Sequence, residues 1–194
     1  GIPIIPKMET ILNILQKFSN IPQESLERFV GKLQETNIPK GGFLIREGEI
    51  CDRLSFIQKG FVRSYYFKDN KDITISFSMQ GEFIASMASF ISQKPSYETI
   101  EALEHCHLYQ ISYQDLMDLF EKDSHLEHLY RLILEQYYVA LEEHLIFSKF
   151  KTAKERYLEL IETKPLIIQK AAVGQVASYL DMSLETLSRI RANI

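Results

Sequence analysis

Cysteine is scarce in this sequence of 194 residues, which contains only Cys51 and Cys106. Two cysteines so far apart can form neither the multi-bridge framework of a small secreted domain nor the close ligand pairs of a zinc site. An iron–sulfur cluster needs about four cysteine ligands, which the sequence cannot supply. The low cysteine content excludes disulfide scaffolds and cysteine-based metal centres. A reducing cytoplasm is the expected location.

Long apolar runs and an excess of positive charge are also missing. No stretch approaches the roughly 18 apolar residues of a membrane span, and no signal-peptide pattern opens the sequence, so we expect no membrane partner. The net charge of −4 argues against a chain that coats nucleic acid without regard to sequence. From Lys149 onward, however, eight Lys or Arg and five Asp or Glu give a net charge of +3, against −7 for the rest. This asymmetry is compatible with an acidic sensor domain joined to a DNA-binding domain.

The hydrophobic pattern predicts helices at the start and a β-rich middle. Ile11, Leu15 and Phe18 recur at helical intervals, and QESLERFVGKL predicts a second amphipathic helix. From Ile38 onward, short segments rich in β-branched and aromatic residues alternate with turn signals that contain Gly, Asp or Asn. Strands at this density predict an antiparallel β jelly roll with flanking helices, in an α+β fold.

The longest helix is predicted from Ser124 to about Phe150, and it is apolar on more than one side. Seven of its residues fall at alternating steps of four and three, the spacing of a coiled-coil seam. A second copy of the helix is the best partner for this seam, and the alternative is a helix buried wholly within one monomer. The predicted dimer-interface residues are Leu126, Tyr130, Ile133, Tyr137, Ala140, His144 and Phe147.

A further helix follows the long one. Thr152 and Glu155 have the spacing of a capping box at its start, and Pro165 requires it to end beforehand. The last segment, QKAAVGQVASYLDMSLETLSRIRANI, then divides into two short helices around Asp181. This residue tolerates the left-handed backbone of a tight turn.

The residues around this turn have the pattern of a helix-turn-helix. Ala177 allows the two helices to cross closely, and Ser183 is a good N-cap for the second helix. The apolar seam between the helices is predicted to contain Val176, Leu180, Leu187 and Ile190.

The opposite face of the second helix has side chains suited to the major groove. Arg can donate twice to guanine, Glu can accept from cytosine, and Ser or Thr can bind a base edge or a phosphate. An isolated Glu–Arg pair four residues apart would more simply be an ion pair on a solvated helix, but the turn and cap before it favour a DNA-reading surface. The predicted DNA-binding residues are Ser183, Glu185, Thr186, Ser188, Arg189 and Arg191.

ASYLDMSLETLSRIR resembles the recognition element of the CRP/FNR family of bacterial transcription regulators, in which E-x-x-S-R reads DNA. IREGEICDRLSFIQKGFVRSYYF, QGEFIASMASF and IEALEHCHLYQIS resemble the cyclic-nucleotide-binding-like β-roll of the same family. The resemblance implies a homodimer on a palindromic site in double-stranded DNA, with RNA polymerase as a further partner. It also implies that Glu185, Ser188 and Arg189 read bases. Leu184 makes the element closer to the FNR type than to the cyclic-AMP-responsive branch.

The resemblance further implies a division of the chain. The expected domains are a β-roll sensor over residues 8–122, a dimerisation helix over 123–150 and a helix-turn-helix domain over 151–194. The segment GIPIIPK before Met8 is left out as a loose arm or a cloning remnant. The sequence stops at Ile194, directly after the second helix, without the β-wing of many family relatives, which leaves open a truncated C-terminus.

The cyclic-nucleotide contacts of the family are not retained. In cyclic-nucleotide binders, a Gly-Glu-Leu segment and a following Arg-Ser pair hold the ribose and the cyclic phosphate. Ala85-Ser86-Met87 and Ser96-Tyr97 stand in their places. We therefore predict no cofactor and an unknown effector that is not cyclic AMP. The candidate effector-pocket residues are Ser86, Met87, Ser96 and Tyr97.

Other site chemistries find little support in the sequence. His105 and His107 lie on one face of a predicted strand without a third ligand at useful spacing, so we predict no metal site and no enzymatic activity. Several aromatic residues either line an apolar ligand cavity or pack the core. The main alternative to a DNA-binding regulator is a small-molecule-binding β-roll whose C-terminal helices serve only dimerisation, and a cupin-type metalloenzyme is a third hypothesis.

Overall fold

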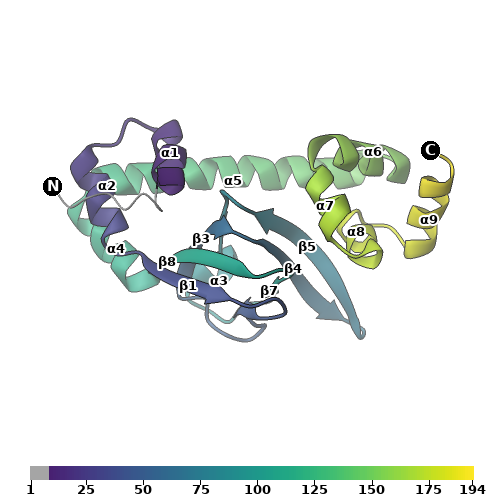
Figure 1. The fold of residues 1–194 in the computed structure, drawn as a ribbon, viewed down its shortest axis with the longest axis horizontal. Helices are drawn as coiled ribbons and strands as arrows, with labels where there is room; N and C mark the ends of the chain where they lie inside the picture. The colour runs from purple at the N-terminus through teal and green to yellow at the C-terminus, as the bar shows by residue number, and fades with distance from the viewer. Residues whose placement is uncertain (1–8) are drawn as a thin grey trace.

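The computed structural model describes residues 9–194. One long helix, α5 (Ser124–Phe150), runs along a side of the elongated molecule and connects its two ends (Figure 1). The bounds predicted for this helix are confirmed. Asp123 caps it, because the carboxylate accepts the backbone N–H of His125 at 3.0 Å. The predicted start of the sensor domain, Met8, and the arm before it lie outside the described residues.

Two short helices, α1 (Glu9–Phe18) and α2 (Gln23–Val30), confirm the amphipathic segments predicted before the strands. Each buries its apolar face, with Ile11 of α1 and Leu26 of α2 almost inaccessible to solvent. Arg28 of α2 donates to the buried carboxylate of Asp123 at 2.7 Å. This ion pair joins α2 to the beginning of α5.

The middle of the described chain forms two antiparallel sheets, with strand orders β1-β8-β3-β6 and β2-β7-β4-β5. The predicted antiparallel body is therefore confirmed. Helix α4 (Tyr113–Lys122) follows the last strand, and the Ser112 hydroxyl caps it. Helix α3 (Met87–Ser92), which follows β6, was not expected from the sequence. The strands are β1 (Gln34–Ile38), β2 (Phe43–Ile45), β3 (Arg53–Lys59), β4 (Phe61–Lys68), β5 (Lys71–Met79), β6 (Phe83–Ile84), β7 (Thr99–Ala102) and β8 (Cys106–Ser112).

The tight connection between β3 and β4 depends on Gly60. Its φ of +139° is unfavourable for a residue with a side chain. A Cβ at this position would lie 2.5 Å from the Sγ of Cys106 and 2.9 Å from its Cα. Because Cys106 is fully buried, any side chain at position 60 would push β8 away from the turn.

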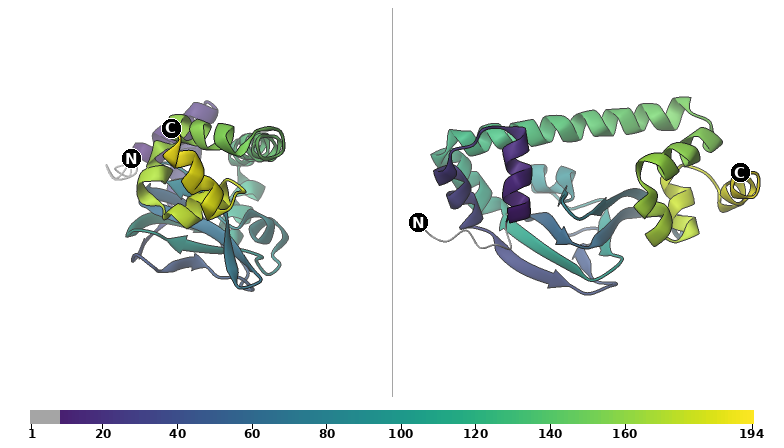
Figure 2. Two further views of the ribbon diagram at one scale, coloured as in Figure 1. Left: turned by 90° about the vertical axis from the view of Figure 1, so that its right-hand side faces the viewer. Right: turned by 45° about the horizontal axis from the view of Figure 1, so that its top comes forward.

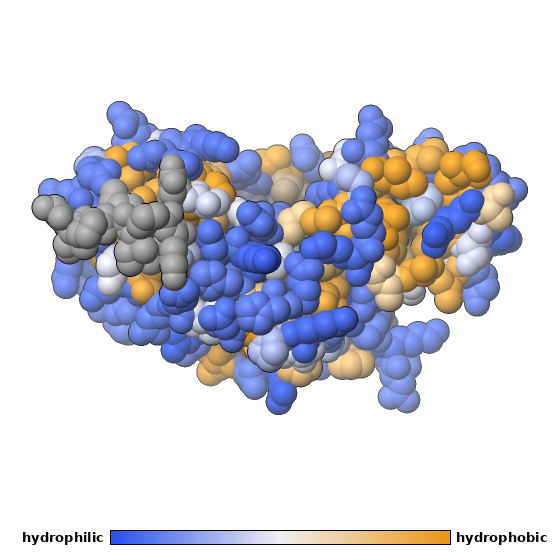
Figure 3. All heavy atoms as spheres, viewed as in Figure 1, coloured by the Kyte–Doolittle hydropathy of each residue, from blue (hydrophilic) through white to orange (hydrophobic). Residues whose placement is uncertain are grey.

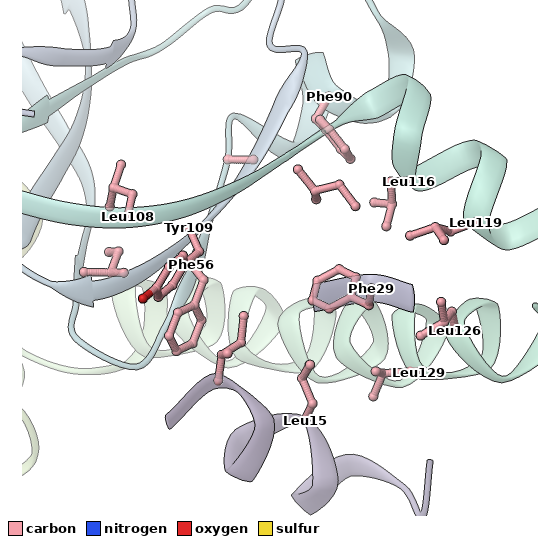
Figure 4. Close-up of a cluster of buried hydrophobic side chains, with 14 of the residues drawn as sticks. Leu15, Phe29, Phe56, Phe90, Leu108, Tyr109, Leu116, Leu119, Leu126 and Leu129 are labelled. Carbon is pink, nitrogen blue, oxygen red and sulfur yellow. The ribbon is translucent and has the colours of Figure 1, made fainter. Parts of the chain in front are cut away.

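The main hydrophobic core contains side chains from both sheets and from α1, α2, α4 and α5. Figure 4 shows Leu126 and Leu129 of α5 close to Leu119 of α4 and Phe29 of α2. The first half of α5 is thus part of the core of its own chain.

A second hydrophobic cluster joins the C-terminal helices to the strands β4 and β5. Figure 2 shows these helices beside the ends of the strands. Phe61 and Phe77 stack with ring centroids 5.5 Å apart, and Tyr179 meets Phe77 edge-on at 5.3 Å. The backbone N–H of Thr74 also donates to the hydroxyl of Ser178 at 3.1 Å. The C-terminal helices are α6 (Ala153–Thr163), α7 (Pro165–Lys170), α8 (Val173–Tyr179) and α9 (Leu184–Ala192).

Candidate nucleic-acid interface

The connection between α8 and α9 adopts the backbone geometry expected from its sequence. Asp181 has a left-handed φ of +54°. The N–H of Met182 then returns to the carbonyl of Ala177 at 3.1 Å. The hydroxyl of Ser183 accepts the N–H of Thr186 at 3.1 Å, which caps α9. The predicted turn and N-cap are both confirmed.

Apolar contacts hold α8 and α9 together. Ala177 and Leu187 are 2% and 1% exposed, and Val176 and Leu180 are buried beside them. Ile190 is half-buried against the same cluster. The seam predicted between the two helices is therefore present, and the opposite side of α9 is left facing solvent.

The solvent-facing side of α9 carries the predicted DNA-binding residues. Arg189 reaches back along the helix, and its Nη2 donates to the Thr186 hydroxyl at 3.4 Å. Within residues 9–194 no ion pair joins Glu185 to Arg189, so the intrahelical pair considered from the sequence is not formed. Exposed on this side are Ser183, Glu185, Ser188, Arg189 and Arg191, with Thr186 half-buried.

The surface around α9 is mixed and not uniformly basic. Figure 3 shows apolar side chains gathered over the C-terminal helices, at the right of the view. Leu158 and Ile161 of α6 are 40% and 38% exposed, and Leu184 of α9 is 48% exposed. The charged face of α9 is therefore a local feature. Such a surface suits recognition of specific groups better than general attraction to a polyanion.

Two features that support this region were not predicted from the sequence. Helix α7 begins with Pro165 at its first position, where the missing N–H costs nothing, so the proline that ends α6 also starts a helix. Arg156 of α6 reaches the turn before α9 and donates to the carbonyl of Leu180 at 2.8 Å. The capping box at Thr152, which is confirmed, could have located this arginine one turn into α6.

The predicted dimer seam faces its own chain in the first half of α5. Leu126 is 3% exposed within the main core, and Tyr130 and Ile133 pack against that core. The four–three spacing did mark one continuous stripe of the helix. In the structure α1, α2 and α4 pack against α5 and cover the first half of this stripe.

The second half of the predicted seam is divided. His144 stacks on Tyr179 with ring centroids 5.3 Å apart, and Phe147 packs against the C-terminal cluster. Burial lowers the pKa of His144 below its usual value and so favours the neutral form of the stacked ring. Tyr137 is 46% exposed and Ala140 is also exposed.

Another side of α5 carries most of its exposed apolar surface. These side chains are about half accessible or more and lie toward the C-terminal end of the helix. They are Tyr138 (64% exposed), Val139 (50%), Leu141 (49%), Leu145 (56%), Ile146 (50%) and Phe150 (83%).

The structure brings two of the four candidate effector residues together. Ser86 and Ser96 are buried, with their hydroxyl oxygens 2.7 Å apart. Met87 begins α3 and packs against the main core, whereas Tyr97 is 82% exposed. The predicted set therefore does not form one pocket.

A small, partly open cavity of about 90 Å³ lies in the β-body, with the exposed residues Glu49, Asp52 and Arg53 among its lining. Ile45, Ile84 and Ile100 give it an apolar wall, and Ser86 is the one candidate effector residue that lines it. Ser55 and Gln110 add a polar side, where the Gln110 amide donates to the Ser55 hydroxyl at 2.8 Å. The volume would hold only a few water molecules or a very small ligand.

The residues considered for metal binding do not converge. His105 is exposed and precedes β8, whereas His107 is half-buried and lies 2.5 Å from the carboxylate of Glu35. Over the described range, no three His, Cys, Asp or Glu side chains come together as metal ligands would. Burial raises the pKa of both Cys51 and Cys106, so these thiols are poor ligands and poor nucleophiles.

Comparison with known proteins identifies the fold of the β-body. Residues 35–123 match the family model of the cyclic nucleotide-binding domain. A search of curated proteins finds no match to this chain. None of the helices in residues 9–194 is long and apolar enough to cross a membrane.

Solved structures resemble the chain beyond the β-body. The c-di-GMP-responsive global regulator CLP of Xanthomonas campestris is 19% identical, with a TM-score of 0.70 over 89% of this chain and 91% of that one. FixK2 of Bradyrhizobium japonicum is 19% identical, with a TM-score of 0.68 over 83% of each chain. The catabolite activator protein of Thermus thermophilus is 18% identical, with a TM-score of 0.59 over 93% of this chain and 85% of that one. The chain therefore has a cyclic nucleotide-binding fold with additional helices.

Proposed function

We propose that this chain is a sequence-specific DNA-binding transcription regulator of the CRP/FNR type that acts as a homodimer. The observation that carries the proposal is the exposed polar face of α9, held in place by the Asp181 turn and the Ser183 cap. Its Glu185 and Arg189 are not tied to each other, so both remain available for a ligand.

The side chains of α9 have distinct roles in this proposal. Arg189 donates to guanine, and Glu185 accepts from the amino group of cytosine. Ser188 lies beside Arg189 and contacts a base edge. Ser183 and Thr186, at the N-terminus of the helix, contact a phosphate or a base edge, where the backbone N–H groups also favour an anion. Arg191 adds a contact from the last turn.

The proposed dimer uses α5 through a seam that differs from the one expected from the sequence. Leu134, Tyr138, Leu141 and Leu145 follow one another at steps of four, three and four. Leu134 is half-buried, and the other three are 49–64% exposed. A second copy of α5 would cover this stripe by knobs-into-holes packing. The two α9 helices would then enter successive major grooves of a palindrome.

The identity of the effector is a question independent of DNA binding. A cyclic nucleotide needs a cation for its phosphate and a carboxylate for its ribose, and the paired hydroxyls of Ser86 and Ser96 supply neither. We expect the β-body to need no cofactor. If it senses a ligand, the cavity beside Ser86 suits a molecule much smaller than a nucleotide. RNA polymerase would be a further partner if the regulator activates transcription.

The cavity also supports a second candidate function, a small-molecule-binding β-roll whose C-terminal helices serve only dimerisation. The two functions differ in one measurement. A DNA-binding regulator selects a palindrome from genomic fragments, with an affinity that falls steeply with salt. The alternative gives a ligand-dependent rise in melting temperature and selects no sequence.

Arg189→Ala tests the base-reading role on the selected palindrome. We expect it to weaken binding by about 1–3 kcal/mol and to relax specificity at one position of each half-site. Arg53→Ala removes an exposed arginine of β3 instead and serves as the charge-matched control. Unchanged binding by the Arg189 variant would mean that α9 does not read DNA in this way.

A further inference from the structure

Arg156 connects three backbone carbonyls that belong to two different helix junctions. The capping box of Thr152 and Glu155 starts α6 and places Arg156 in its first turn. Its Nη1 donates to the carbonyl of Lys151 at 2.7 Å. Its Nε donates to the carbonyl of Leu180 at 2.8 Å, and its Nη2 approaches that of Asp181 at 3.4 Å.

The first acceptor lies at the junction between α5 and α6. Lys151 is the C-cap of α5 and leaves helical geometry with φ −92° and ψ 145°. Carbonyl groups at a helix C-terminus have no partner within the helix, so they need a donor from elsewhere. Arg156 supplies this donor at the point where the chain changes direction.

The other acceptors lie in the turn between α8 and α9. Leu180 is the C-cap of α8, and Asp181 has the left-handed backbone that redirects the chain into α9. An arginine side chain is suited to hold both junctions, because its donors form a planar, rigid fork that is always charged. One guanidinium therefore links the end of α5 to the start of the proposed reading helix.

We propose that Arg156 is a positioning residue that fixes the direction of α9 relative to α5. This inference rests on the proposed function. In a homodimer joined along α5, the direction of α9 relative to that helix determines how far apart the two reading helices lie. Arg156 would therefore set the half-site spacing that the dimer accepts, without touching DNA itself.

Neighbouring contacts strengthen the junction between α5 and α6 but do not reach the turn before α9. The ammonium group of Lys151 pairs with Glu159 of α6 and lies 4.7 Å from the ring centroid of Phe147. These contacts join α5 to α6, whereas Arg156 extends the connection to the turn. Removal of the guanidinium should thus loosen the turn before α9, while the contacts between α5 and α6 and the apolar cluster around Leu187 remain.

The test compares full-length wild type, Arg156→Met and Arg156→Lys on palindromes whose half-sites are at the selected spacing or are moved by one or two base pairs. Methionine keeps much of the apolar stem without a donor, and lysine keeps the charge without the fork. We expect Arg156→Met to lose about tenfold in affinity at the selected spacing and to bind the shifted sites almost as well. Arg156→Lys should recover only part of the spacing preference.

Lys154→Met provides the matched control, because it removes one exposed positive charge from the same turn of α6. A phosphate-contacting role would lower affinity at all spacings alike, and it would reduce the salt dependence as the loss of one phosphate contact does. The positioning role is overturned if Arg156→Met keeps the wild-type spacing preference, or if its effect equals that of Lys154→Met.

Circular dichroism must show the same helix content in all variants. If wild type itself selects no DNA, the proposed function fails together with this inference, whereas wild-type binding with an unchanged Arg156→Met variant overturns the positioning role alone.

Discussion

The hydroxyl of Ser86 donates to the hydroxyl of Ser96 across 2.7 Å, at the two positions that the family resemblance aligns with the ribose-binding Glu and the phosphate-binding Arg. Ser86 is the donor of this hydrogen bond, because the Ser96 hydroxyl already donates to the carbonyl of Glu98 at 2.8 Å. According to the resemblance, two neutral groups that bind each other stand where cyclic-nucleotide binders have two charged groups that hold the ligand.

We expect cyclic AMP to bind this protein with a Kd weaker than about 1 mM, because the neutral hydroxyls of Ser86 and Ser96 supply neither a cation for its phosphate nor a carboxylate for its ribose. Isothermal titration calorimetry with the full chain would measure this. Cyclic GMP serves as the control for base-specific contacts. A micromolar Kd for either nucleotide would contradict the interpretation of the serine pair.

The two serines should differ in their contribution to stability. Ser96 accepts from Ser86 and from the N–H of Glu98 at 3.1 Å, and it donates to Glu98 as well. Ser96→Ala leaves these buried groups unpaired, so we expect the free energy of unfolding to fall by about 1–3 kcal/mol. Ser86→Ala removes one donor and should cost about 1 kcal/mol. Urea unfolding would compare them, and a larger loss for Ser86→Ala would be inconsistent with this network.

Ser183 allows stability and DNA binding to be separated. Ser183→Ala removes the cap of α9 and should lower the free energy of unfolding by about 1 kcal/mol. Ser183→Asp keeps a capping oxygen but adds a negative charge at the proposed phosphate contact. We expect near wild-type stability for the Asp variant and weaker DNA binding for both. If Ser183→Asp binds the selected palindrome as tightly as wild type, Ser183 does not contact a phosphate.

Asp123 should make stability depend on pH. Burial by itself would raise the pKa of its carboxyl group, but hydrogen bonds from Ser25, Arg28 and the backbone of His125 outweigh burial and lower it. A carboxylate with a lowered pKa in the folded state stabilises the protein above the unfolded pKa of about 3.9. That contribution is lost as the pH falls through the folded pKa, which lies below the ordinary value.

Asp123→Asn should therefore lower the free energy of unfolding at pH 7 by about 1–3 kcal/mol. The difference from wild type should shrink as the pH falls below about 4. Chemical denaturation at several pH values would measure this, with the exposed Glu121→Gln variant as the control. A difference that stays constant between neutral pH and pH 3 would exclude this carboxylate as the cause.

The orientation of α5 can be tested with two adjacent residues. Leu141 belongs to the proposed seam, and Ala140 belongs to the seam expected from the sequence. Both are exposed in the described chain. Leu141→Glu should convert the dimer to a monomer, because it places a charge where a second helix packs. Ala140→Glu should remain dimeric. Sedimentation equilibrium would measure the oligomeric state of both variants. A dimeric Leu141→Glu and a monomeric Ala140→Glu would favour the seam expected from the sequence.

Local patterns allowed several elements to be predicted from the sequence. The bounds of α5, the left-handed Asp181 and the cap at Ser183 depend on a few neighbouring residues, and all are confirmed. These features follow from backbone geometry and hydrogen bonding within one or two turns. The proposed base readers on α9 follow from the resemblance, and they stay a prediction.

The direction in which α5 faces could not be predicted, because the helix is apolar on several sides. Leu126 begins one four–three stripe, and Leu134 lies in another. Periodicity alone does not say which stripe meets the β-body. The choice depends on packing with Phe29 of α2, which is distant in the sequence, and with Leu119 of the neighbouring helix α4. Arg156 was missed for a similar reason, since its acceptors at Leu180 and Asp181 lie in another segment.

The second hydrophobic cluster should couple the unfolding of the C-terminal helices to that of the β-body. Phe61 and Phe77 belong to the strands, but they are buried with Val176 and Leu187 of the C-terminal helices. A β-body cut at residue 150 would expose these rings to water and would tend to aggregate. Heat should therefore unfold the intact chain in a single cooperative transition, although the expected domains divide it into separate parts.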